Sequence, residues 1–388
     1  MDDPVYLFLS RFARGACDAE RRRELRDAAR DFSARMPEWA GVAEQAEAQG
    51  MAPLLLHLLR QAGGAPPPRV ERVLQGLALQ HRAANAVRFG ALREVLDGLA
   101  GAGIPVLVLK GAALAHLVYP EPGLRPMGDL DLLVPPDALA PALETLRGLG
   151  YRDLPPDPGA LWQAEHRHPP PVRRIAGGPP VVIELHTDLF AQSGERSPDA
   201  GNVWADPRPV PLPGGADVRT LGHEAMLLHL CWHLVNIRHL ADQVVRPRLI
   251  WIADIVSYAE QYAEDIDWAA LCARRPFIRS TLALLHYLIP LSAGLRDRLG
   301  VREAGRRPRG VGEGYRGWPT RPLAAPDRGR LDRYLRDTFQ PPEWWLRLHY
   351  GLGPEGTLFW TRWCRHPGRI LGGVAHKLIR QYRYSSAR

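Results

Sequence analysis

Apolar residues recur at steps of three and four through most of the chain and alternate over only a few short segments. Three-and-four spacing predicts helices. They are expected at 6–12, 21–36, 52–61, 70–99, 138–149, 225–240, 249–262, 268–274 and 280–291. Short apolar or alternating runs predict strands. They are expected at 104–109, 129–134, 172–175 and 181–186. The pattern predicts an α+β protein with a small mixed β-sheet core, flanked by N-terminal and C-terminal helical regions.

Pro- and Gly-rich stretches divide the chain into five segments, and 207–215 is a linker by composition. The length exceeds that of a usual single domain, so several structural units are expected. The expected segments are an N-terminal helical region at 1–100, a core at 101–206, a helical domain at 216–300, an Arg/Gly/Pro-rich connector at 301–328 and a C-terminal helical segment at 329–388.

The stretch 104–134 concentrates the features that indicate chemistry. It predicts a strand, a glycine turn at Gly111, a helix, a Pro- and Gly-rich loop and a second strand that begins at Asp129. Side chains alternate along a strand, so Asp129 and Asp131 would share a face, roughly 6.6 Å apart along it. Two carboxylates that close repel unless a cation lies between them, and Mg²⁺ prefers oxygen ligands. An isolated pair of this kind is also common at a solvated strand end.

The glycine turn provides the context that favours a metal and nucleotide site. A helix that begins there has free N–H groups and a dipole that favour an anion such as a phosphate. Lys110 stands beside the turn and is one of only two lysines in a chain whose other basic residues are arginines. A flexible ammonium at this position could reach a phosphate, and the alternative is a lysine that only caps the strand end.

In its order and spacing this stretch resembles the polymerase-β-like nucleotidyltransferase superfamily. It is most similar to a poorly characterised branch with the signature L-K-G-x-A-L followed by R-x-x-x-D-L-D-L-L-V, which stands here at 109–114 and 125–134. The resemblance implies a nucleotidyltransferase core in which Asp129 and Asp131 are catalytic and bind Mg²⁺ or Mn²⁺. It also implies that Lys110, Gly111, Ala112 and Arg125 bind the nucleotide.

Two positions depart from the superfamily pattern. Many members have Ser where Ala112 stands, so backbone N–H groups and nearby cations would have to hold the phosphates. The third carboxylate of the superfamily corresponds to Glu184, where Asp is usual. The resemblance implies that Glu184 holds the catalytic metal or activates the acceptor hydroxyl.

Histidines near these positions allow two interpretations. His186 shares a strand face with Glu184 and could assist proton transfer or be a partly buried strand residue. His229 and His233 have the spacing of metal ligands on a helix, but apolar neighbours and the lack of a third ligand favour packing. Arg248 and Asp254 resemble a basic and acidic pair that follows the core in this branch of the family.

Composition limits the classes of binding partner and the cell compartment that are expected. The net charge of +8 is spread among neighbouring acids rather than concentrated in a basic arm, so stable nucleic-acid binding is not expected. No apolar run approaches the roughly twenty residues of a membrane span. The four cysteines lie far apart without metal spacing, and a cytoplasmic protein is expected. The segment after residue 329 is rich in Arg and Trp. It could form a helix on a membrane surface, but the prolines and glycines that interrupt it favour a docked helical pair.

The resemblance implies an enzyme that transfers a nucleoside monophosphate from an NTP donor to a small-molecule or peptide/protein acceptor. Two alternatives stay open. The fold could serve as a non-catalytic module that binds a nucleotide or a partner, or the protein could be a phosphotransferase that passes on the γ-phosphoryl group.

Overall fold

The computed structural model describes most of the chain. The described residues are 4–15, 17–153, 171–175, 178–190, 201–212, 217–235, 248–301, 338–341, 343–353 and 357–372. The chain forms two compact units. The larger unit comprises Pro4–Leu234 and Arg248–Asp267, and the smaller comprises Met1–Asp3, Val235–Pro247 and Trp268–Arg388. Every predicted site residue belongs to the larger unit, whereas the predicted connector at 301–328 lies outside the described residues from position 302 onward.

A mixed five-stranded sheet forms the centre of the larger unit, with strands in the order β1-β2-β5-β4-β3. The strands are β1 (Leu107–Val108), β2 (Leu130–Leu133), β3 (Arg152–Asp153), β4 (Val172–Arg174) and β5 (Val181–His186). The pair β2–β5 is parallel and the other three pairs are antiparallel. This confirms the α+β class, although β1 covers only two of the six predicted strand residues and Asp129 precedes β2 rather than lying in it.

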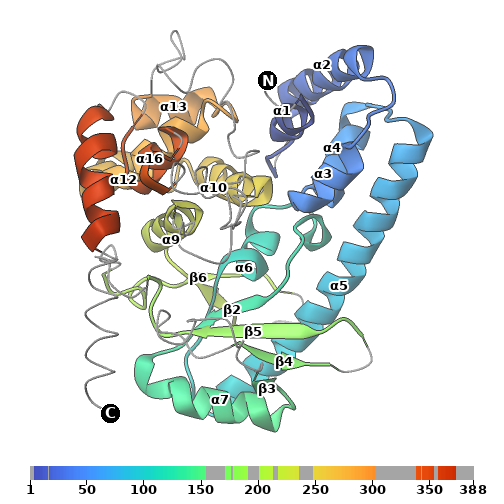
Figure 1. Ribbon diagram of the computed structural model, residues 1–388. Helices are drawn as coiled ribbons and strands as arrows, with labels where there is room; N and C mark the ends of the chain where they lie inside the picture. Colours follow the sequence, from blue (N-terminus) through green and yellow to red (C-terminus); the bar gives the residue numbers. More distant parts are fainter. Residues whose placement is uncertain are drawn as a thin grey trace. The chain divides into compact units, whose positions relative to one another are not determined.

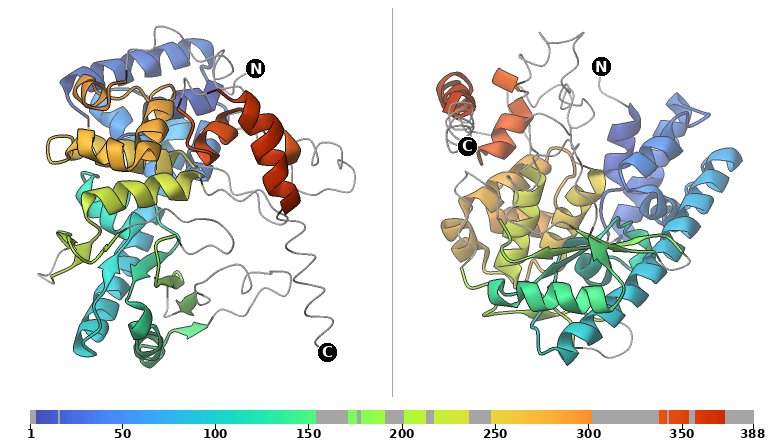
Figure 2. Two further views of the ribbon diagram at one scale, coloured as in Figure 1. Left: turned by 90° about the vertical axis from the view of Figure 1, so that its left-hand side faces the viewer. Right: turned by 60° about the horizontal axis from the view of Figure 1, so that its bottom comes forward.

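Helices make up most of the rest of the larger unit (Figure 1). They are α1 (Pro4–Arg11), α2 (Ala19–Arg35), α3 (Val42–Ala48), α4 (Ala52–Ala62), α5 (Pro68–Gly101), α6 (Lys110–Leu117), α7 (Leu139–Gly148), α9 (His223–Val235) and α10 (Leu249–Gln261), with short turns η1 (Pro122–Leu124) and η2 (Pro136–Ala138). Helices α5 and α7 pack against each other beside the strands (Figure 2). Their contact is close at Gly98, where an added Cβ would lie 3.1 Å from Leu149. The predicted linker instead includes β6 (Arg208–Pro209), which pairs with β7 (Arg219–Thr220).

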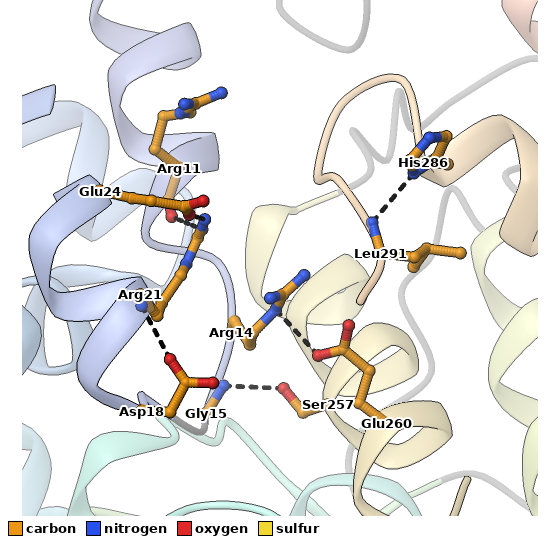
Figure 3. A network of polar contacts seen from close by, with 10 residues as sticks. All are labelled: Arg11, Arg14, Gly15, Asp18, Arg21, Glu24, Ser257, Glu260, His286 and Leu291. Atoms are coloured by element: carbon orange, nitrogen blue, oxygen red, sulfur yellow. Dashed lines mark hydrogen bonds and ion pairs between the residues drawn. The ribbon is translucent and has the colours of Figure 1, made fainter. Parts of the chain in front are cut away.

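The N-terminal helices are joined to α10 by polar contacts that follow α1 (Figure 3). The backbone N–H of Gly15 donates to Ser257 Oγ at 2.8 Å. Arg14 Nε lies 2.9 Å from a carboxylate oxygen of Glu260. The α10 residues therefore belong to the same compact unit as the first helices, although about 240 positions separate them in the sequence.

The smaller unit is helical in its described residues. It contains α11 (Trp268–Arg274), α12 (Pro276–Leu285), α13 (Ala293–Leu299), α16 (Glu343–His349) and a π-helical stretch at Thr361–Arg365. His286 Nδ1 accepts a hydrogen bond from the backbone N–H of Leu291 at 3.0 Å, closing the turn after α12. Among the helices described in the two units, none is long and apolar enough to cross a membrane.

Candidate active site

The candidate site lies where β2 and β5 run side by side. In their parallel register Asp131 is opposite Glu184, and His186 lies two residues further along β5. Because side chains two apart share a face, these three side chains converge. One oxygen or nitrogen atom from each lies within 4.8 Å of the others. Two carboxylates and one imidazole at this separation could hold a divalent cation.

Asp131 is the electrostatic centre of this cluster and is 4% exposed. Its Oδ1 accepts from Lys110 Nζ at 2.7 Å and faces His186 Nε2 at 2.8 Å. Burial opposes ionisation, but the Lys110 charge and the His186 hydrogen bond outweigh it and hold the pKa of Asp131 well below its usual range. Asp131 is thus a carboxylate whose charge two neighbouring bases stabilise.

Lys110 and His186 change their protonation equilibria in return. Burial lowers the pKa of each, but the nearby carboxylates outweigh it, so both pKa values are raised. His186 Nε2 also lies 3.5 Å from Glu184 Oε2. The charge of Lys110 and the proton on His186 therefore compensate the carboxylates of Asp131 and Glu184, a task that a bound metal ion could also perform.

Asp129 sits at the exposed edge of the cluster, just before β2. The charge of Asp131, followed by desolvation, raises the pKa of Asp129 to about 6. The structure thus brings the predicted D-x-D pair together as two unequal acids. Asp131 is buried and paired with Lys110 and His186, so the repulsion between the two carboxylates raises the pKa of Asp129 instead.

The backbone at Lys110 has an unusual conformation. Lys110 is the first residue of α6 and has a left-handed φ of 45°. Such a conformation costs a non-glycine residue about 1–3 kcal/mol and persists only where the surroundings fix it. Here the Nζ contact to Asp131 directs the side chain across the start of the helix. The first N–H groups of α6 have no acceptor within the helix, as at any helix start.

Arg125 lies behind this helix start in a buried ion pair. Its Nη2 lies 2.6 Å from Asp254 Oδ2 on α10, and its Nη1 donates to the Pro126 carbonyl at 2.9 Å. Arg125 is 8% exposed and Asp254 1%. Tyr119 donates its hydroxyl to Asp254 Oδ1 at 2.7 Å. Asp254 therefore pairs with Arg125, and burial together with the Asp254 charge raises the pKa of Tyr119 well above its usual value.

Gly111 provides the space for this arginine. A Cβ added at Gly111 would lie 2.3 Å from Arg125 Nη1 and 2.9 Å from its guanidinium carbon. Ala112 follows in the buried first turn of α6. Gly111 therefore leaves room for the Arg125 side chain, and the role of Gly111 and Ala112 in nucleotide binding stays a prediction.

Helix α9 places two histidines near the cluster, where the sequence favoured packing. His229 contacts the Phe190 ring at 6.2 Å between centroids, and His233 meets the Trp251 ring edge-on at 4.7 Å. Burial first, then the nearby Lys110 charge, lowers the pKa of His233 to about 3 and that of His229 well below its usual value. Both are neutral aromatic neighbours of the site.

Sequence reasoning missed one basic residue of the site altogether. Arg88 lies in the middle of α5, and the Asp129 charge acts on it. Nothing in the helical pattern distinguishes Arg88 from the exposed arginines of the same helix. Only the packing of α5 beside the loop that carries Asp129 identifies it.

Comparison with known proteins identifies a family for this chain. Residues 35–290 match a family described as an uncharacterised nucleotidyltransferase. A comparison with curated proteins found no match. A solution structure of the antibiotic-resistance factor ANT(2'')-Ia is similar at 16% identity and a TM-score of 0.35, covering 52% of this chain and 96% of that one. A likeness this weak carries no argument about activity.

Proposed function

The chain belongs to the uncharacterised nucleotidyltransferase family, and from this premise we propose that it transfers a nucleoside monophosphate from an NTP to a small-molecule or peptide acceptor. The observation that carries the proposal is the convergence of Asp131, Glu184 and His186 within 4.8 Å, beside Asp129 and the start of α6. Acidic oxygens next to a helix start are what a metal-bound triphosphate requires.

The donor set fits a divalent cation. Asp129, Asp131 and Glu184 would hold Mg²⁺ or Mn²⁺, and His186 would supply a nitrogen ligand or a hydrogen bond to one. Imidazole suits transition metals better than it suits Mg²⁺, so this set favours Mn²⁺. When bound, the cation would neutralise the oxygens of the transferred phosphoryl group.

The residues of the chain would perform the remaining tasks. The acceptor oxygen forms a bond to the α-phosphorus, the bond from that phosphorus to the bridging oxygen breaks, and pyrophosphate leaves with the electron pair. Glu184 would take the acceptor proton, since its half-buried carboxylate lies at the edge of the cluster. Lys110 would exchange its Asp131 contact for a phosphate oxygen, and the N–H groups of Gly111 and Ala112 would bind phosphate. Arg125 would hold the loop before Asp129 in position through Asp254.

Intact-mass analysis tests the transfer. The full chain is incubated with each NTP, Mn²⁺ or Mg²⁺ and candidate acceptors, including the protein itself. Addition of a nucleoside monophosphate with release of pyrophosphate is expected, and Asp131→Asn should abolish it. Label from α-labelled NTP in the product supports this proposal, whereas label only from γ-labelled NTP would indicate a phosphotransferase instead.

Two contacts of Asp131 favour a second candidate function. Because Lys110 and His186 already compensate Asp131, the site could bind a nucleotide without any metal and without turnover. Calorimetry with ATP in the presence of a chelator distinguishes the two. Metal-free binding with no product in the mass analysis would favour a non-catalytic nucleotide-binding module.

A further inference from the structure

Arg88 is a half-buried arginine whose guanidinium forms no ion pair within the described residues. Its Nε and Nη1 are buried and have no hydrogen-bond partner among the described residues. No ion pair of Arg88 occurs within that part of the chain. Burial lowers the pKa of Arg88, and the Asp129 charge opposes this by raising it. The guanidinium is therefore close enough to Asp129 to respond to its charge, yet forms no ion pair with it.

Arg248, on a different element, also has a buried guanidinium nitrogen without a partner in the part of the chain that the structure describes. It occupies the N-cap position of α10, and its Nε is buried without a partner in the described chain. Its Nη2 runs beside Gly50, 3.2 Å from where a Cβ would stand. Burial and the charge of Arg125 lower the pKa of Arg248, while Glu47 and Asp129 act in the opposite direction.

Both arginines are fixed relative to the loop that carries Asp129. On α5, one turn before Arg88, Asn85 Nδ2 donates to the carbonyls of Pro122 and Arg125 at 3.0 and 2.9 Å. On α10, Asp254 holds the Arg125 side chain of the same loop. The loop is therefore tied to both helices, and each helix brings one arginine to it.

A buried polar group without a partner is costly, and a charged one more so. The other cations of the site avoid this cost, because Lys110 is paired with Asp131 and Arg125 with Asp254. Within the described part of the site, Arg88 and Arg248 are the arginines whose charge remains available for an incoming anion. Guanidinium groups bind phosphate oxygens in a two-pronged geometry, which suits this task better than a single ammonium would.

We propose that Arg88 and Arg248 form a phosphate clamp that binds the β- and γ-phosphates of the NTP, beside the carboxylates that face its α-phosphate. The inference rests on the proposed nucleotidyl transfer and assigns its triphosphate site. The clamp would stabilise the departing pyrophosphate as charge develops on it.

The test measures affinity by calorimetry for inorganic tripolyphosphate, ATP and AMP, with Mn²⁺ present, in the full chain. Arg88→Gln and Arg248→Gln should each weaken tripolyphosphate and ATP binding roughly 10- to 100-fold, the usual effect of a charge-assisted hydrogen bond. AMP binding should change less than threefold. Arg93→Gln is the matched control, because Arg93 is an exposed arginine on the same helix.

Thermal melting separates a clamp from a structural role. Removing an unpaired buried charge should leave the melting temperature unchanged or raise it, whereas loss of a structural arginine would lower it. Arg88→Lys and Arg248→Lys should retain part of the tripolyphosphate affinity. Wild-type tripolyphosphate affinity in both Gln variants would overturn the clamp.

The outcomes also separate the clamp from the proposed transfer. If the wild type transfers nucleotide while both Gln variants bind ATP normally, the clamp is wrong and the function stands. If no acceptor is ever modified, but tripolyphosphate affinity still falls in the variants, the clamp stands and the transfer is wrong. An equal loss of AMP and tripolyphosphate affinity, with a lowered melting temperature, would assign the arginines a structural role and also overturn the clamp.

Discussion

Asp131→Asn and Asp129→Asn should have opposite effects on stability, although both acids belong to the same D-x-D motif. Asp131 is 4% exposed, and its Oδ1 is shared by Lys110 and His186. Removing one partner of a buried ion pair costs about 3–5 kcal/mol. Lys110 is partly exposed and the Glu184 charge also acts on it, which reduces the expected cost to about 2–3 kcal/mol. At about 2–4 °C per kcal/mol for a unit of this size, the melting temperature should fall by roughly 4–12 °C.

Asp129→Asn should stabilise the metal-free protein instead. The pKa of Asp129 is raised to about 6 by Asp131 and by desolvation, so its ionised form is disfavoured in the folded state. Because Asp129 is exposed, solvent screening limits the gain to at most about 1 kcal/mol. The sign follows from linkage. The folded-state pKa exceeds the unfolded value, so the penalty on the wild type grows as pH rises from about 4 to 6 and then levels off.

Differential scanning calorimetry in chelator at pH 4.5 and 7.5 measures both effects. The Asn variant at position 131 should melt lower than the wild type, and Lys110→Met in the same chain should recover part of the loss, since it removes the unpaired ammonium. The variant at 129 should gain more stability at pH 7.5 than at pH 4.5. An unchanged melting temperature for Asp131→Asn would refute the buried ion pair, and a gain at 129 that is equal at both pH values would refute the charge repulsion.

Three further substitutions test the site. Gly111→Ala should lower stability by about 3 kcal/mol in denaturant unfolding, because its Cβ would displace the Arg125 guanidinium from Asp254; Gly128→Ala, with open space around it, is the control. His186→Asn should reduce the preference for Mn²⁺ over Mg²⁺ in metal titrations of transfer activity. Glu184→Gln should lower kcat by roughly 10²- to 10⁴-fold with nucleotide affinity kept if Glu184 acts as the base, and should weaken nucleotide binding itself if it is chiefly a metal ligand; wild-type kcat and affinity would exclude both roles.

The α+β class and most helices were predictable because each depends on a local pattern. The spacing of apolar residues identified α10 and α11 to within one residue at each end, and the alternation before His186 identified β5. Helix α3, the short β3 and the β6–β7 hairpin were missed. Elements of two residues have no period to detect, and β6 lies in a stretch whose prolines indicated a linker.

Fewer residues of the candidate site than elements of the fold could be identified from the sequence. Motif order indicated the proximity of Asp131 and Glu184, and the register of β2 and β5 now accounts for it. The left-handed backbone at Lys110 could not be predicted, because lysine has no intrinsic preference for it. Nor could the place of Arg88 near Asp129 or the pairing of Arg125 with Asp254, since these residues are far apart in the sequence and such contacts leave no local signal in it.

The pairing of Arg125 with Asp254 explains why α10 belongs to the same compact unit as the sheet. Gly111 leaves room for the guanidinium, Asp254 neutralises it from α10, and the Arg125 carbonyl accepts from Asn85 on α5. The loop that ends at Asp129 is thus held at one residue by two helices that are distant in sequence. A displacement of α10 would move Arg125, and with it the relative positions of Asp129 and Arg248. The helices that flank the core therefore act as parts of the candidate site, because they position its charges.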